Sequence, residues 1–274
     1  MKNLLTRSIT GLVFVSIILG SLLLGQITFL IVFGAILTGA LAEFYSFFKN
    51  GNYRPGKMAG YIAGFVVFFL SYLASAGYIQ ANYLFAIFPV LLLIFIFELF
   101  SKKTSPIENV GISFLAFGYI SVPLSLVNFL VFPAFDDKPQ FTPDLLIAVL
   151  AIIWVYDSAA YLFGVSFGRH RLFERISPKK SWEGAIGGAL AAPAASFGIS
   201  IFIPEISLVN WIILSVMVVV SATLGDLTES MIKRSFGIKD SSNFFPGHGG
   251  ILDRFDSLLF VIPMVVLYLK LIIE

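Results

Sequence analysis

Residues 83–100 read YLFAIFPVLLLIFIFELF, and every residue in this stretch except Pro89 and Glu98 is hydrophobic. A helix needs roughly 20 apolar residues to cross the hydrocarbon core of a bilayer, so this stretch predicts a membrane-spanning helix. The whole chain shares the bias: 58% of its 274 residues are hydrophobic and 12% are charged, against roughly 25% charged residues in a soluble domain. A chain of this length cannot bury so much apolar surface in water. The composition therefore excludes a soluble globular enzyme.

Eight further apolar runs, separated by short polar breaks, extend this pattern along the chain. We expect an all-α, polytopic membrane helix bundle of about nine transmembrane helices. The predicted spans are 8–24, 27–48, 58–76, 83–100, 111–131, 145–164, 184–202, 208–226 and 255–273. This pattern divides the chain into an N-terminal part of about five spans, 1–145, and a C-terminal part, 146–274.

The positions of lysine and arginine predict how the helices are oriented. With nine spans and a cytoplasmic N-terminus, 16 of the 18 Lys and Arg residues fall on the cytoplasmic side, and only Lys138 and Lys270 fall outside. Such an asymmetry follows the positive-inside rule. We therefore expect a multi-pass protein of the cytoplasmic membrane with its N-terminus in the cytoplasm.

Charged residues gather in two predicted cytoplasmic segments, 165–183 and 226–256. Together these segments hold 16 of the 34 charged residues and both histidines, His170 and His248. We expect the chemistry of the protein there. The net charge of +2 does not indicate a nucleic-acid partner. The absence of cysteine excludes disulfides, thiolate nucleophiles and cysteine-bound metals.

The segment 226–256 presents acidic side chains at the ends of two predicted helices. On a helix that continues out of the eighth span, the spacing i, i+3, i+4 and i+7 places four polar residues on one face: Asp226, Glu229, Ser230 and Lys233. At the start of the ninth span, Asp253 and Asp256 also share a face. One or two carboxylates, together with water and substrate phosphate oxygens, form the usual site of Mg²⁺. These helix ends therefore predict a site for a hard cation such as Mg²⁺.

A glycine-rich loop, 247–250 with the sequence GHGG, lies between these acidic helix ends. Glycine adopts positive φ without strain, so such a loop can turn its N–H groups toward an anion beside the positive end of the next helix dipole. The basic residues around the loop are Lys233, Arg234, Lys239 and Arg254. Together these groups indicate a polyphosphate site; the alternative is a solvated connection between two membrane helices. The P-loop and G-x-G-x-x-G patterns are both missing from the sequence, which gives no support to an ATPase or a dinucleotide-binding domain.

The segment 165–183, which we expect to be a loop, contains most of a basic stretch, RHRLFERISPKKSWEG, at 169–184. Its residue types fit two functions equally well. One is electrostatic attachment to anionic lipid, and the other is a clamp on the phosphate groups of a substrate.

Three acidic residues lie inside or near the ends of other predicted spans, where a carboxylate is unfavourable and is often functional. Glu43 and Glu98 are near predicted cytoplasmic ends, and we expect structural roles in which they reach water or Lys49 and Lys102. Asp157 is deeper in its span, and we expect it at or beside the functional site.

The C-terminal pattern resembles that of a known family, the CDP-diacylglycerol synthases, also called phosphatidate cytidylyltransferases. In that family's signature a Ser precedes Lys-Arg, then Lys-Asp, a small residue, a Pro, His-Gly-Gly and Asp-Arg-x-Asp. The same spacing is kept here by Ser230, Lys233, Arg234, Lys239, Asp240, Ser242, Pro246, His248, Gly249, Gly250, Asp253, Arg254 and Asp256. Two upstream stretches, 225–227 and 176–184, also resemble family motifs, with Ser181 where Thr is more usual. The resemblance covers roughly 150–260.

The resemblance implies the reaction CTP + phosphatidate → CDP-diacylglycerol + pyrophosphate, a Mg²⁺-dependent step of phospholipid biosynthesis; a second cation of unknown identity is compatible with it. It implies that Asp226 and Asp253 hold the catalytic metal, with Glu229, Asp256 and Asp157 nearby. The implied catalytic residues are Asp226, Asp253, Lys233, Arg254 and Asp256. The implied substrate-binding residues are Lys179, Lys180, Ser177, Ser230, Arg234, Lys239, Asp240, His248, Gly249 and Gly250. The expected partners are CTP, phosphatidate in the bilayer and a second copy of the chain in a homodimer, with no nucleic acid, and the active site is expected on the cytoplasmic side.

Two alternatives stay open. Another CTP-dependent membrane transferase, such as a polyprenol kinase, would release CDP instead of pyrophosphate. A transporter would carry charges near the midplane of several spans, whereas the charges here gather at the predicted cytoplasmic ends of the last four spans.

Overall fold

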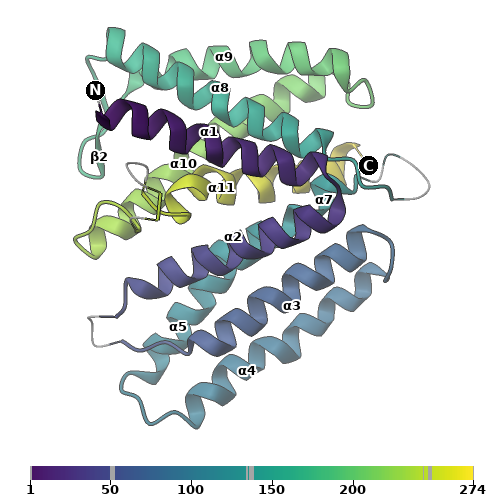
Figure 1. The fold of residues 1–274 in the computed structure, drawn as a ribbon, viewed down its shortest axis with the longest axis vertical. Coiled ribbons are helices and arrows are strands. Elements are labelled where there is room, and N and C mark those ends of the chain that lie inside the picture. Colours follow the sequence, from purple (N-terminus) through teal and green to yellow (C-terminus); the bar gives the residue numbers. More distant parts are fainter. Residues whose placement is uncertain are drawn as a thin grey trace. The chain divides into compact units, whose positions relative to one another are not determined.

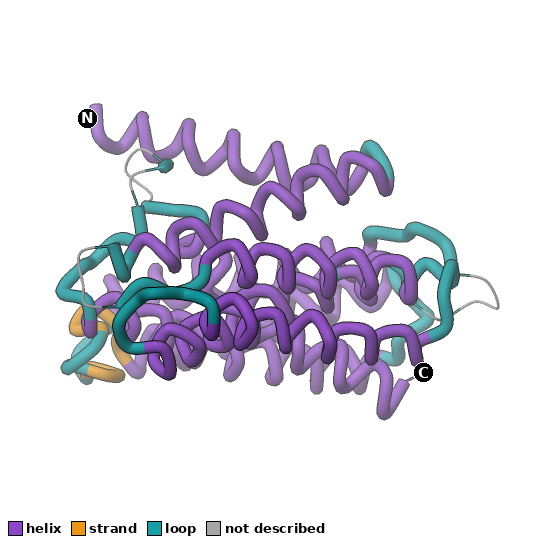
Figure 2. The backbone as a smooth tube through the Cα atoms, turned by 90° about the horizontal axis from the view of Figure 1, so that it is seen from below, coloured by secondary structure: helices purple, strands orange, loops and turns teal. Residues whose placement is uncertain are grey.

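The structure is a computed structural model that describes residues 2–49, 53–133, 135, 139–242, 244–245 and 249–273. The chain forms two compact units: unit 1 comprises Met1–Phe141 and Asp240–Phe255, and unit 2 comprises Thr142–Lys239 and Asp256–Glu274. Helices make up most of both units (Figure 1), and Figure 2 shows the two short strands of unit 2 among them.

Unit 1 consists of apolar helices that follow one another through short loops. Its helices in chain order are α1 (Lys2–Leu23), α2 (Gln26–Ser46), α3 (Lys57–Ser75), η1 (Ala81–Ala86), α4 (Ile87–Leu99), α5 (Pro106–Ala116), η2 (Phe117–Ser121), α6 (Val122–Leu126) and α7 (Asn128–Val131). The turn at η2 is π-helical. Pro123 explains this turn, because a proline has no N–H to bond the carbonyl of Tyr119 four residues earlier.

The core of unit 1 lies along one face of α2. Phe29, Phe33, Leu37 and Phe44 are fully buried, and they recur with the three-to-four-residue spacing of a helix face. Glu43 is buried on the same helix. A carboxylate in this position needs hydrogen-bond donors, because burying an unpaired charge is very unfavourable.

Unit 2 is built from three long helices, a hairpin and most of a fourth helix. Its elements are α8 (Asp144–Phe167), the antiparallel strands β1 (Arg171–Phe173) and β2 (Ser177–Ser181), α9 (Trp182–Phe202) and α10 (Leu208–Ser235). The helix α11 (Leu252–Tyr268) belongs to unit 2 from Asp256 onward, and η3 (Leu269–Ile273) follows it.

Helices α8 and α9 lie side by side (Figure 1) because glycines of α9 face α8. A Cβ at Gly187 would overlap the ring of Phe163, and one at Gly188 would lie 2.6 Å from the ring of Tyr156. Small residues allow membrane helices to approach this closely. At the end of β2, the Ser181 hydroxyl accepts a hydrogen bond from the N–H of Gly184 at 3.2 Å and caps α9. The hairpin is therefore fixed to the start of α9.

The predicted all-α polytopic bundle is confirmed. Among the described residues, eight helical segments are long and apolar enough to cross a bilayer: Gln26–Ser46, Lys57–Ser75, Ala81–Leu99, Pro106–Val131, Asp144–Phe167, Trp182–Phe202, Leu208–Ser235 and Leu252–Ile272. The described apolar part of α1, Ile9–Leu23, is shorter. With α1, these segments correspond to the nine predicted spans, and α10 continues past its span as expected. Which side of the membrane holds the N-terminus stays a prediction.

Two details of the prediction are wrong. The fifth span begins at Pro106 rather than at residue 111, because the polar residues Glu108 and Asn109 belong to the first turn of α5. The segment 165–183, expected as a loop, contains the hairpin of β1 and β2.

Candidate active site

In unit 1, Glu43 of α2 holds the loop that precedes α11. Its Oε1 accepts hydrogen bonds from the Ser242 hydroxyl at 2.6 Å and the Ile251 N–H at 2.9 Å. Its Oε2 accepts from the Ser241 hydroxyl and the Leu252 N–H, both at 2.8 Å. Since α11 begins at Leu252, these N–H groups are donors that have no partner within the helix, and a carboxylate is the favourable group at that positive end. The expectation that Glu43 reaches water or Lys49 is therefore wrong.

Asp253 is anchored in the same loop of unit 1. Its Oδ2 accepts hydrogen bonds from the Ser241 N–H at 2.8 Å and the Gly250 N–H at 2.7 Å, and the Ser241 hydroxyl also lies 2.8 Å away. The Ser241 hydroxyl is thus within hydrogen-bond distance of two carboxylates, those of Asp253 and Glu43. These contacts fix the Asp253 side chain relative to α2.

The glycines of this loop make room for the two carboxylates. Gly249 has a φ of +79°, and a Cβ added there would overlap Asp253. A Cβ at Gly250 would overlap Glu43 and Ser241. The prediction of positive φ in this loop is confirmed at Gly249, whereas Pro246, Gly247 and His248 lie outside the described residues.

In unit 2, Asp226 of α10 forms an ion pair with Lys180 of β2. Its Oδ1 also accepts a hydrogen bond from the Ser230 hydroxyl at 3.3 Å, one turn further along α10. Both side chains of the ion pair are 30% exposed, so an incoming anion or cation could compete for either partner. Here a residue of the segment 165–183 meets one of the segment 226–256, within a single unit.

Asp256, in the part of α11 that belongs to unit 2, is close enough for this pair to act on it. The charges of Asp226, Asp157 and Lys180 all act on Asp256, whose own Oδ1 accepts from the Ser257 N–H at 2.6 Å. Helices α10 and α11 approach closely here, because a Cβ at Gly225 would lie 2.6 Å from the backbone carbonyl oxygen of Asp256. The structure thus gathers three predicted acidic residues and one predicted cation within unit 2.

The other predicted residues of α10 have different partners. Glu229 forms an ion pair with Lys233, and both side chains are buried. Arg234 donates to the carbonyl oxygen of Ile238 at 3.2 Å, beyond the end of the helix. Glu229 and Lys233 therefore neutralise each other. Lys179, Lys239 and Arg254 are predicted site residues whose side chains are exposed and form no ion pair with a described carboxylate.

The remaining predicted residues and acids are placed as follows. Ser177 is half-buried at the start of β2, and Asp240 is exposed. Glu98 is buried and accepts from the Asn109 side-chain amide at 2.7 Å, so its partner is Asn109 and not the expected Lys102. Glu43 and Ser241 are the residues that sequence reasoning missed as parts of this region; a carboxylate inside a predicted span was the signal for Glu43.

Comparison with known proteins assigns the chain to a family. A model of the cytidylyltransferase family matches residues 5–272, which include both groups of carboxylates. The chain belongs to this cytidylyltransferase family.

Two curated relatives illustrate how far this chain is similar to named proteins. It is 47% identical over 124 residues to a phosphatidate cytidylyltransferase of Haemophilus influenzae, which is 43% of each chain. It is 41% identical over 152 residues to a phosphatidate cytidylyltransferase of Staphylococcus aureus, which is 55% of this chain and 57% of that one. The matched stretch thus spans about half the length of these curated relatives.

The close approach of α10 and α11 in unit 2 leads to a stability prediction. The Gly225→Ala variant is expected to lose about 1–3 kcal/mol of folding free energy, because its new methyl group meets backbone atoms of Asp256 and Ser257. Gly198→Ala in α9 is the matched control, since nothing lies within 4 Å of a Cβ added there. Thermal unfolding in detergent measures both. Equal midpoints for the two variants would contradict the packing at Gly225.

Proposed function

We propose that this chain is a membrane-bound nucleotidyltransferase that converts CTP and phosphatidate to CDP-diacylglycerol and pyrophosphate. The observation that carries the proposal is the match to the cytidylyltransferase family over residues 5–272. The name phosphatidate cytidylyltransferase of the relatives at 47% and 41% identity supports this choice of substrates. The proposed partners also include a second copy of the chain in a homodimer. The proposed location is the cytoplasmic membrane, with the active site on the cytoplasmic side.

The proposed reaction needs charge neutralisation and alignment more than a protein nucleophile. An oxygen of the phosphatidate phosphate attacks the α-phosphorus of CTP, the bond from that phosphorus to the bridging oxygen breaks, and pyrophosphate leaves with that oxygen. A phosphate monoester with a second pKa of about 6 is largely dianionic at pH 7, so no base has to activate it. Lys179, Lys239 and Arg254, exposed and without a carboxylate partner among the described residues, are the proposed cations for the phosphate groups.

The acidic residues of the candidate site suit Mg²⁺, because this ion prefers oxygen ligands such as carboxylates. Among the described residues, no group of three or more His, Asp or Glu side chains is arranged to hold a metal ion. Mg²⁺ commonly takes only one or two carboxylates and completes its shell with water and substrate phosphates. We propose Asp226 and Asp253 as its protein ligands, an assignment that rests on the sequence motif, with Glu229, Asp256 and Asp157 as neighbouring groups. When bound, Mg²⁺ would neutralise charge on the triphosphate, and a second cation belongs to the same proposal.

Lys180 has a specific part in this proposal. In the structure it neutralises Asp226. If the carboxylate of Asp226 turns to the metal, the ammonium of Lys180 is released for a substrate phosphate. The carboxylate of the pair would then bind the metal, and the ammonium would bind the phosphate. The 30% exposure of both side chains is consistent with this exchange of partners.

Two labelled forms of CTP test the function. The purified full-length protein is incubated with phosphatidate, Mg²⁺ and either α-³²P-CTP or γ-³²P-CTP. We expect label from the α position in the lipid fraction, and label from the γ position only in pyrophosphate. Label from the γ position in lipid, with release of CDP, would instead identify a lipid kinase.

A further inference from the structure

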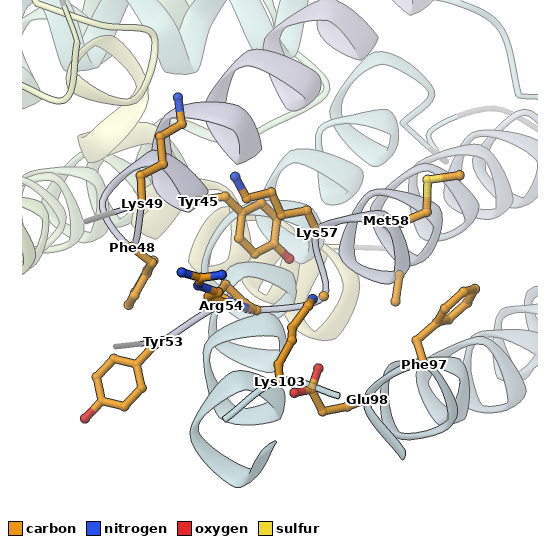
Figure 3. Close-up of a pocket in the computed structure, with 13 residues that line it drawn as sticks. Tyr45, Phe48, Lys49, Tyr53, Arg54, Lys57, Met58, Phe97, Glu98 and Lys103 are labelled. Atoms are coloured by element: carbon orange, nitrogen blue, oxygen red, sulfur yellow. The ribbon is translucent and has the colours of Figure 1, made fainter. Parts of the chain in front are cut away.

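Unit 1 contains a second basic region that the signature motifs do not include. It is a pocket of about 510 Å³ at the C-terminal ends of α2 and α4 and the N-terminal end of α3 (Figure 3). Four of its lining residues are basic: Lys49, Arg54, Lys57 and Lys103. Lys49 follows α2, Arg54 precedes α3, Lys57 is the first residue of α3, and Lys103 follows α4. Cations from three separate chain segments therefore surround one concave surface.

The described lining of this pocket holds four cations and one carboxylate, so its net charge is positive. None of the ion pairs between described residues includes any of the four. The acidic residue that lines the pocket, Glu98, is buried, and its carboxylate already accepts from the Asn109 amide at 2.7 Å. The Asn109 side chain in turn accepts from the Arg54 N–H at 2.7 Å, which ties the end of α4 to the start of α3. A fixed pocket with several unpaired cations is complementary to an anion with several oxygens, such as a phosphate group.

The apolar wall of the pocket indicates what the phosphate is attached to. Met58 and Phe97 line the pocket and are 69% and 47% exposed. Their helices continue the apolar surface: Phe65 and Phe69 of α3 are exposed, and only 11% of the spanning window of α4 is buried inside the protein. In a chain that spans a membrane, such faces contact acyl chains. A free phosphate ion has no apolar part that could contact this wall.

We propose that this pocket binds the phosphate of an anionic glycerophospholipid, with the acyl chains lying along α3 and α4. None of the residues that line this pocket belongs to the proposed catalytic or substrate-binding set, and in this proposal its occupancy does not depend on CTP. Each basic residue near an anionic lipid contributes about five-fold in affinity. The pocket should therefore distinguish phosphatidylglycerol from the net-neutral phosphatidylcholine.

Lipid binding by the full-length protein in a neutral detergent tests this proposal, without CTP. Native mass spectrometry measures how much phosphatidylglycerol or phosphatidylcholine each variant retains across a lipid titration. The Arg54→Gln/Lys57→Gln variant removes two charges of the pocket. Lys103→Gln and Lys102→Gln form a matched pair of neighbours, because Lys103 lines the pocket and Lys102 does not. Thermal unfolding of each variant shows whether it is folded, and a further arm titrates inorganic phosphate.

We expect the wild-type protein to prefer phosphatidylglycerol. Lys103→Gln should weaken phosphatidylglycerol binding about five-fold and the double variant about 25-fold, with phosphatidylcholine binding unchanged. Lys102→Gln should bind like the wild type. The same loss in Lys102→Gln and Lys103→Gln, or no loss in a folded double variant, would overturn the proposal. Binding of inorganic phosphate at this pocket without a preference for phosphatidylglycerol would overturn the lipid assignment.

Discussion

The Asp253→Asn variant is expected to form CDP-diacylglycerol roughly 10²–10³-fold more slowly, the range found when one preorganised electrostatic group is removed from an active site. Asparagine keeps the shape of the side chain and one oxygen, so it can still accept from the N–H groups of Ser241 and Gly250. It loses the negative charge that the proposed Mg²⁺ site requires. The measurement is incorporation of α-³²P-CTP into lipid by the purified variant, together with its thermal midpoint.

Two companion variants separate the charge of Asp253 from its role in the loop. Asp253→Ala removes the acceptor as well, and it should also lower the thermal midpoint, because two N–H groups lose their partner. Asp144→Asn is a control for the change of charge, since Asp144 is exposed at the start of α8. Near-normal turnover by a folded Asp253→Asn variant would remove Asp253 from the proposed metal site.

The helices of this protein could be predicted from the sequence because the signal is local. Residues 83–100 form η1 and α4 almost as their composition predicts. The start of the fifth span was missed for a physical reason: Asn109 is polar, yet it is buried because it bonds Glu98 and the backbone of Arg54. A partner supplied by another helix removes the unfavourable free energy of a polar group in the membrane, and composition does not show such partners.

The same limit applies to the candidate site. The spacing of Asp226, Glu229 and Lys233 places them on one helix face, where Glu229 and Lys233 form an i,i+4 ion pair. That spacing does not predict the partner of Asp226, which is Lys180. Lys180 reaches Asp226 from a hairpin that the sequence did not predict. Glu43 bonds residues 198 to 209 positions away in the chain, and no pattern within one sequence links positions so far apart. Sequence motifs therefore identify the charged residues of the candidate site, whereas contacts between distant parts of the chain determine which of those residues already have a partner.

The Glu43→Ala variant is expected to lower both stability and turnover, although Glu43 lies far from the signature residues in sequence. Its carboxylate is the acceptor for the N–H groups of Ile251 and Leu252 and for two serine hydroxyls. The hydroxyls can rotate toward other acceptors, but the N–H groups at the start of α11 cannot. We expect a loss of about 2 kcal/mol or more from the unpaired donors. Turnover should fall about 10–100-fold, as when a residue that orients a metal ligand is lost, because Ser241 also holds Asp253.

Glu43→Gln tests whether Glu43 acts through its two acceptor oxygens. Each oxygen of Glu43 accepts one backbone N–H and one hydroxyl. Whichever way the glutamine amide turns, its NH₂ group faces one of the N–H groups, so this variant should be intermediate between wild type and Glu43→Ala. Glu205→Ala, which removes an exposed carboxylate between α9 and α10, should match the wild type. Wild-type turnover and midpoint in Glu43→Ala would mean that the loop before α11 keeps its conformation without the carboxylate, and that Asp253 is positioned by the loop alone.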